Sequence, residues 1–357
     1  MLIYSCFFLL VSGLIFLAAM ISQVQAKFLI TAVFLILVLF AGLRGLVGAD
    51  TLSYLTFYDQ FKDPDVAASY LTKMEPIFVL LITAHSHLID SKFLYILMIS
   101  VLQTWILYLV FKQSSKKYYF LLFYILLFYL NFHFNVTRAA IAAMLFLLAL
   151  TSSSTKVKLL SAILAPGFHV SVLFFYPLLF AHLNLKRFLL LVFLSIAGLI
   201  LALQNFSYFV MKYNAYQDYL TGYSPGLSIY NIIIFASVIL SIVFLRKFSF
   251  LYLAASLFLL ISLCIAEVFP IGYRLLSIGL LIYLFFLLEE LSRENYKLYY
   301  AFFWIPVALT FGSSFYGVLQ ETTRLEERIE MGIGDGLDAS LKSTYIPYQF
   351  YWADDDI

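Results

Sequence analysis

Residues 93–111 read FLYILMISVLQTWILYLVF and lie between Lys92 and Lys112. The stretch contains no charged residue, and it approaches the roughly 20 apolar residues that a helix needs to cross the hydrocarbon core of a bilayer. Only Ser100, Gln103 and Thr104 interrupt its apolar residues, whereas a barrel strand would alternate apolar and polar residues throughout. Residues 93–111 therefore predict a membrane-spanning helix.

Similar runs fill most of the chain. Of the 357 residues, 64% are hydrophobic and 12% are charged, against about 25% charged in an ordinary soluble domain. This composition excludes a water-soluble globule and predicts an all-α polytopic membrane protein with about 10–12 transmembrane helices. The apolar runs fall at 4–22, 28–43, 77–89, 93–111, 118–134, 138–151, 157–180, 188–204, 227–245, 248–266, 270–288 and 298–318.

The apolar runs place residues 1–318 in one transmembrane domain, and residues 319–357 form a C-terminal tail. Residues 44–76 and 205–226 are the polar breaks long enough to fold over the membrane surface. The tail holds nine acidic and three basic side chains, a net charge of −6, while the whole chain carries +2, a balance that does not suggest nucleic acid as a partner. Cys6 and Cys264 lie in apolar runs and are expected to pack rather than pair.

Basic residues in short loops favour the cytoplasmic side. Twelve plain spans would place the first two basic clusters opposite the last two. The conflict disappears if 77–89, a short run, and 157–180, interrupted by Pro166-Gly167, are re-entrant or interfacial segments. This alternative predicts ten full spans, with the N-terminus, 44–76, 205–226 and the tail outside. The clusters are Lys112-Lys116-Lys117, Lys156-Lys158, Lys186-Arg187 and Arg246-Lys247.

Arg44 and Asp50 lie where the second span ends, in a stretch with glycines at 42, 45 and 48. Ionisable groups near a membrane span are costly, so each one is a candidate site residue. Asp50 could act as a general base, or it could cap the helix that follows. Arg44 could bind phosphate, or its long side chain could reach toward the interface.

Glu75 and Arg138 mark two further polar interruptions. Glu75 precedes Pro76, a pattern typical of a helix start, but its carboxylate is also a candidate base. Arg138 follows Asn135 at the mouth of a span, where a guanidinium can bind two phosphate oxygens. A turn with an interfacial arginine is the alternative interpretation.

His169, Glu267 and Arg274 complete the candidate set. His169 follows the Pro166-Gly167 break inside an apolar stretch, where a histidine is either a hydrogen-bonded core residue or a functional group. Because its unperturbed pKa lies near neutrality, His169 is the favoured general base. Glu267 and Arg274 flank a turn and could form an ion pair, or Arg274 could join Arg44 and Arg138 at the outer face.

The sequence contains no metal-binding signature, nucleotide-binding loop or hydrolase nucleophile motif. We therefore expect chemistry that uses no metal and no other cofactor.

Residues 44–61 resemble the Arg…Gly-x-Asp-x-x-x-Tyr stretch of the EpsG-like exopolysaccharide polymerases, which belong to the wider group of Wzy-type repeat-unit polymerases. The next landmarks of that family are similar to Glu75-Pro-Ile-Phe, Asn135-Val-Thr-Arg138, Phe168-His169-Val-Ser171 and Tyr273-Arg274, in the same order. The resemblance covers about 40–290. Ala49 and Thr137 depart from the family pattern, but neither departure removes an ionisable group.

The resemblance implies an architecture like that of GT-C glycosyltransferases, and inverting, metal-independent glycosyl transfer outside the bacterial cytoplasmic membrane. A glycan on undecaprenyl diphosphate would pass to a second lipid-linked repeat unit, in exopolysaccharide, capsule or O-antigen synthesis. The catalytic residues would be His169, as base or diphosphate contact, Asp50, which would orient the acceptor sugar or act as base, and Glu75 as a further candidate base. A chain-length regulator and a flippase would be partners. The substrate-binding residues would be Arg44, Arg138, Arg274, Tyr54, Asn135, Glu267 and Tyr273. The alternative is a lipid-linked oligosaccharide flippase or another membrane transporter.

Overall fold

The computed structural model describes residues 2–45, 47, 48, 51–181, 186, 189–193, 229–245, 248–268, 272–293 and 312. Several expectations fall outside these residues: Asp50, the loop 205–226, the acidic tail, and most of the runs 188–204 and 298–318. Over the described ranges the chain is helical and forms no strand, which confirms the all-α prediction.

The helices follow the apolar runs closely. They are α1 (Leu2–Met20), α2 (Gln23–Gly42), α3 (Thr51–Gln60), α4 (Pro64–Tyr70), α5 (Pro76–Leu88), α6 (Lys92–Gln113), α7 (Lys117–Tyr124), η1 (Ile125–Tyr129), η2 (Asn131–Asn135), α8 (Thr137–Thr151), α9 (Thr155–Phe168), η3 (Val170–Phe180), α12 (Ile229–Phe244), α13 (Phe250–Val268) and α14 (Gly272–Arg293). Among the described residues, four helices are long and apolar enough to cross a bilayer, in α1, α2, α6 and α13, and five shorter apolar helices accompany them. The chain is therefore a multi-pass membrane protein, and the total of ten full spans stays a prediction.

Two of the predicted cytoplasmic loops meet at the C-terminal end of α14. Glu289 accepts hydrogen bonds from the Ser114 hydroxyl (2.9 Å) and the Ser115 amide (3.0 Å). The neighbouring residue, Glu290, accepts from the backbone amide (3.2 Å) and the hydroxyl of Ser249, just before α13. Ser114 and Ser115 thus lie at the same end of the bundle as Ser249, as the ten-span arrangement requires and twelve plain spans do not allow. We call this end of the molecule the basic-loop end.

The run 157–180 reverses direction at His169. The Tyr176 hydroxyl donates to the carbonyl oxygen of Ala162, although an unbroken helix would separate these residues by about 21 Å. The reversal follows from the sequence, because Pro166 has no N–H to bond the Ala162 carbonyl four residues earlier, which leaves that oxygen for Tyr176. The predicted break is correct, but it lies at His169 rather than at Pro166-Gly167: α9 continues through Phe168. The hairpin is compatible with a re-entrant segment.

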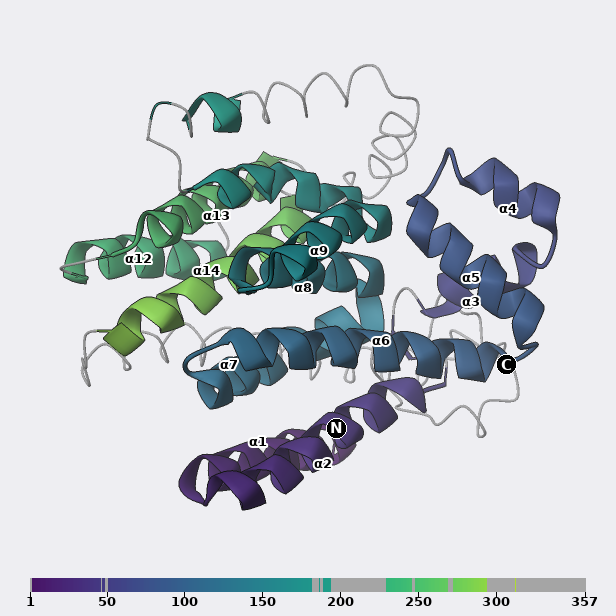
Figure 1. Cartoon of the computed structure of the whole chain (residues 1–357), viewed down its shortest axis with the longest axis horizontal. Coiled ribbons are helices and arrows are strands. Elements are labelled where there is room, and N and C mark those ends of the chain that lie inside the picture. Colours follow the sequence, from purple (N-terminus) through teal and green to yellow (C-terminus); the bar gives the residue numbers. More distant parts are fainter. Residues whose placement is uncertain are drawn as a thin grey trace, which may run out of the picture.

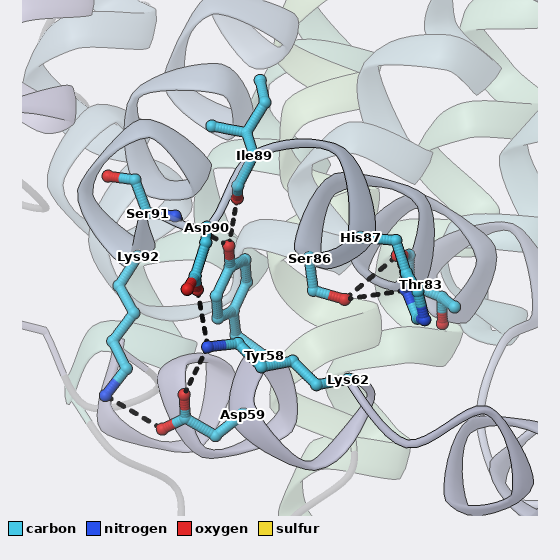
Figure 2. A network of polar contacts seen from close by, with 10 residues as sticks. All are labelled: Tyr58, Asp59, Lys62, Thr83, Ser86, His87, Ile89, Asp90, Ser91 and Lys92. Atoms are coloured by element: carbon cyan, nitrogen blue, oxygen red, sulfur yellow. Dashed lines mark hydrogen bonds and ion pairs between the residues drawn. The ribbon is translucent and has the colours of Figure 1, made fainter.

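Helices α3, α4 and α5 gather at one side of the molecule, next to the N-terminal end of α6 (Figure 1). Figure 2 shows what ties α3 to the turn between α5 and α6. The Tyr58 hydroxyl donates to the Ile89 carbonyl and accepts from the Ser91 amide at 3.0 Å. Two ion pairs, Lys62–Asp90 (2.6 Å) and Lys92–Asp59 (2.9 Å), surround it. The ion pairs are partly or largely exposed to solvent and contribute little. The buried Tyr58 therefore anchors the group formed by α3, α4 and α5, which we call the cap.

The arrangement predicts which exposed positions react from outside the cell. Ser69→Cys, in α4, is expected to be labelled by an impermeant maleimide in intact cells, in a background without Cys6 and Cys264. Ser115→Cys and Ser153→Cys, both exposed in short loops, are expected to react only after the cells are opened. Labelling of Ser115→Cys in intact cells would contradict the ten-span arrangement.

Candidate functional site

Five ionisable residues predicted from the sequence lie at helix ends far from the basic-loop end. Arg44 follows α2, Glu75 precedes α5, Arg138 lies in the first turn of α8, His169 separates α9 from η3, and Arg274 lies in the first turn of α14. Arg274 is 15 residues, or about 22 Å of helix, from Glu289. We call these five residues the arginine site.

Arg44 is 3% exposed and is held in place by the chain around it. One terminal nitrogen donates to the Ala41 carbonyl at 2.7 Å, and Nε donates to the Thr51 hydroxyl at 3.4 Å. The guanidinium carbon lies 4.9 Å from the centroid of the Phe134 ring, a cation–π geometry. These contacts fix a buried positive charge instead of letting the side chain extend toward solvent.

Gly48 brings the Arg44 turn against η2. Its φ of +107° is disfavoured for residues with a Cβ, and an added Cβ would lie 2.2 Å from the Phe134 carbonyl oxygen. The glycine therefore permits the close approach that places Phe134 beside Arg44.

Gly48→Ala is expected to destabilise the protein, by about 1–3 kcal/mol from backbone strain alone, and to lower its activity. Gly13→Ala is the matched control, because nothing lies within 4 Å of the Cβ it would add. Thermal unfolding of the two purified variants in detergent compares them. Equal stability of the two variants would show that the Gly48 conformation is not required.

Arg138 and Glu75 form a buried ion pair, with 2.5 Å between a terminal guanidinium nitrogen and a carboxylate oxygen. Their side chains are 10% and 4% exposed, and the guanidinium carbon lies 5.1 Å from the centroid of the Phe78 ring. Glu75 begins α5 with Pro76 as the sequence predicts, but its side chain makes no capping hydrogen bond to that helix. The carboxylate instead serves Arg138, which is 63 residues away in the chain.

Gly167 joins this pair to the second half of the site. The side chain of Ile77, two residues after Glu75, fills the space beside the Gly167 Cα, where an added Cβ would lie 2.3 Å from it. His169 lies two residues further on, and its Nε2 is 3.5 Å from a terminal nitrogen of Arg274. The α5 and α9 helices thus bring Glu75, Arg138, His169 and Arg274 into one region.

The hydrogen bonds of His169 indicate which ring nitrogen carries the proton. The Ser171 backbone amide donates to Nδ1 at 3.2 Å. Because a backbone amide can only donate, Nδ1 is the unprotonated nitrogen, and the neutral ring carries its proton on Nε2. A guanidinium also can only donate, so the longer Arg274 contact of 3.5 Å is not a hydrogen bond in this tautomer. Nε2–H and the Arg274 guanidinium are then two donors side by side, an arrangement suited to a shared anion.

The other residues that the sequence predicts for the site are Tyr54, Asn135, Glu267 and Tyr273. The Tyr54 ring lies 5.5 Å from the Phe78 ring, which puts Tyr54 near Arg138. Asn135 ends η2, next to Phe134. Glu267 accepts a hydrogen bond from Asn231, and the ion pairs between described residues do not include one between Glu267 and Arg274. Tyr273 is exposed.

Two buried residues near Arg44 were not predicted. His133 is fully buried in the π-helical η2, its ring 4.5 Å from that of Tyr129. Neither of its nitrogens has a hydrogen-bond partner among the described residues. Tyr95, in α6, also buries a hydroxyl that lacks a partner in the same part of the chain. Both residues have mostly apolar or aromatic neighbours in the sequence. The sequence alone therefore does not distinguish a functional His133 or Tyr95 from a residue that only packs in the core.

A search of the described residues for three or more His, Cys, Asp or Glu side chains able to hold a metal finds no such group. The ionisable groups of the arginine site are three guanidinium groups, one carboxylate and one imidazole.

The sequence matches the model of the EpsG family over residues 27–324. No curated protein and no solved structure matches it. The family match covers most of the chain, including every residue of the arginine site and the helices that position them. The chain belongs to the EpsG family.

Proposed function

We propose that this protein polymerises oligosaccharide repeat units carried on undecaprenyl diphosphate, at the outer face of the bacterial cytoplasmic membrane. Membership in the EpsG family supports polysaccharide polymerisation. The lipid-linked glycan would be the donor, and the terminal sugar of a second lipid-linked unit the acceptor. Exopolysaccharide, capsule and O-antigen are the product classes that this chemistry serves.

The observation that carries the proposal is the burial of Arg44 and Arg138 in one end of a membrane protein, 3% and 8% exposed. When a sugar leaves its diphosphate carrier, negative charge builds on the leaving oxygens. Fixed guanidinium groups in a site of low dielectric stabilise that charge without reorganising. Arginine also offers a planar pair of donors that matches phosphate oxygens.

The remaining residues take distinct roles in this proposal. Arg274 and the Nε2–H of His169 contact the same diphosphate, as their adjacent donors suggest. Glu75 positions Arg138 rather than serving as a free base, because the ion pair engages its carboxylate. Asp50 lies between Gly48 and Thr51, next to the Arg44 turn in sequence, and is left as the residue to accept the proton from the attacking sugar hydroxyl.

A single displacement at the anomeric carbon would invert its configuration, as in glycosidases that use a base rather than a nucleophile. The glycosidic bond to the diphosphate breaks, the acceptor oxygen forms the new bond, and its proton passes to the base. This reaction requires no cofactor. A chain-length regulator and a flippase are proposed partners.

Transport of the same lipid-linked units is the second candidate. A pathway across the membrane would need polar groups along its depth, whereas the five residues of the arginine site lie at helix ends in one part of the molecule. This concentration of charge favours polymerisation.

Analysis of lipid-linked glycans from a deletion strain separates the two functions. Accumulation of single repeat units exposed at the outer face is the expected result. Accumulation of units that remain on the cytoplasmic face would instead identify a flippase.

A further inference from the structure

Tyr95 lies in the first turn of α6 with 1% of its surface exposed, and its hydroxyl has no hydrogen-bond partner in the described part of the chain. Nearly all buried polar groups in proteins are hydrogen-bonded. An unsatisfied buried group has lost its hydrogen bonds to water without gaining any in return, which is unfavourable. The free hydroxyl therefore requires an explanation that packing alone does not supply.

The ring of Tyr95 is fixed by neighbours that belong to the cap. Its centroid lies 5.4 Å from that of Tyr58 and 5.7 Å from that of His85. Tyr58 is itself bonded to both sides of the turn between α5 and α6. The position of the phenol is thus determined before any ligand arrives.

The electrostatic surroundings of this hydroxyl identify what it is prepared to bind. The guanidinium groups of Arg44 and Arg138 are both close enough to Tyr95 to act electrostatically on its phenol. Glu75 pairs with Arg138, so two guanidinium groups and one carboxylate are the described charges here, and together they favour an anion over a cation. A phenol next to them can donate one hydrogen bond to that anion without adding charge.

We propose that the Tyr95 hydroxyl donates to a phosphoryl oxygen of a diphosphate held between Arg44 and Arg138. This inference rests on the proposed function, because it assigns a third type of donor to the same lipid carrier. In the free protein the hydroxyl is unsatisfied, and binding of the diphosphate satisfies it. The Tyr95 hydroxyl is therefore a ligand-binding group and contributes little to the stability of the free protein, whereas the buried ring packs in the core.

Two conservative substitutions test this inference with opposite expected results. Tyr95→Phe removes only the unpartnered oxygen, so the melting temperature without ligand is expected to stay the same or rise. The dissociation constant for farnesyl diphosphate is expected to rise by about tenfold or more, as for the loss of a hydrogen bond to a charged group. Tyr129→Phe is the matched control, because Tyr129 is equally buried and donates to the Leu37 carbonyl at 2.6 Å. It is expected to melt earlier and to bind with unchanged affinity.

The measurement uses the purified full-length protein in detergent with three probes: farnesyl diphosphate, inorganic pyrophosphate and farnesol. A similar loss of affinity for both diphosphates, with none for farnesol, supports a contact to the diphosphate. Tighter wild-type binding of farnesyl diphosphate than of pyrophosphate identifies the lipid carrier as its source, and the reverse order identifies free diphosphate.

Wild-type affinity of Tyr95→Phe for both diphosphates would overturn the role of Tyr95 and leave the proposed function intact. A loss of affinity for farnesol as well would overturn it too, because the residue would then contact the chain. If the wild-type protein binds neither diphosphate, both the inference and the diphosphate chemistry of the proposed function are wrong.

Discussion

His169→Ala is expected to lower the rate of polymerisation by about 10²–10³-fold, the usual loss when one donor to a developing negative charge is removed. His169→Gln is expected to retain activity within about tenfold of the wild type, because the glutamine amide can place an N–H near the position of Nε2. This difference follows from the Ser171 amide, which donates to Nδ1 and leaves the proton of the neutral ring on Nε2.

A general base would behave differently, since glutamine cannot accept a proton at this position and both variants would then lose activity equally. The rates are to be measured in membranes supplied with lipid-linked repeat units at matched expression. His87→Ala is the control, because His87 is exposed and bonds to the Thr83 carbonyl of its own helix. Equal losses in the two His169 variants, with His87→Ala unaffected, would return His169 to the role of base.

Breaking the Glu75–Arg138 pair is expected to cause the largest loss of stability of any single substitution in the arginine site. Removal of one partner leaves the other charge buried, which typically costs about 3–5 kcal/mol. Glu75→Gln and Arg138→Gln are each expected to lower the free energy of unfolding by this order. The double variant is expected to lose less than the sum of the two, because it leaves no unpaired charge.

Chemical unfolding in detergent of the two single variants and the double variant gives the coupling energy. The Lys92–Asp59 pair, with a similar distance of 2.9 Å but side chains 30% and 48% exposed, is the matched control. Its coupling is expected to stay below about 1 kcal/mol. Equal coupling in the two pairs would show that burial does not strengthen the Glu75–Arg138 interaction.

The sequence predicts the helices well because lipid and core impose the same local requirement. The run 93–111 became α6, Lys92–Gln113, with charged residues near both ends. The run 157–180 was correctly expected to be interrupted. The position of the interruption could not be predicted, because it depends on Tyr176 reaching back to the carbonyl that Pro166 leaves free.

The members of the arginine site were also predictable, because a charge near a membrane span is rare enough to be noticed. Their pairing was not. Glu75 and Arg138 are 63 residues apart in the chain, and His169 and Arg274 are 105 apart. Neither separation is short enough for a helical repeat in the sequence to indicate that the two residues are in contact. The alternative pairing of Glu267 with Arg274 was suggested by proximity in sequence, and the hydrogen bond from Asn231 to Glu267 replaces it.

We propose that the arginine site joins lipid-linked repeat units with release of the diphosphate carrier. The decisive experiment uses purified protein reconstituted in vesicles and supplied with one defined lipid-linked repeat unit. Longer lipid-linked glycans, one undecaprenyl diphosphate released for each new bond, and loss of both products in Arg44→Lys and Arg138→Lys are the expected results. Movement of the units across the vesicle membrane without any lengthening would contradict this proposal.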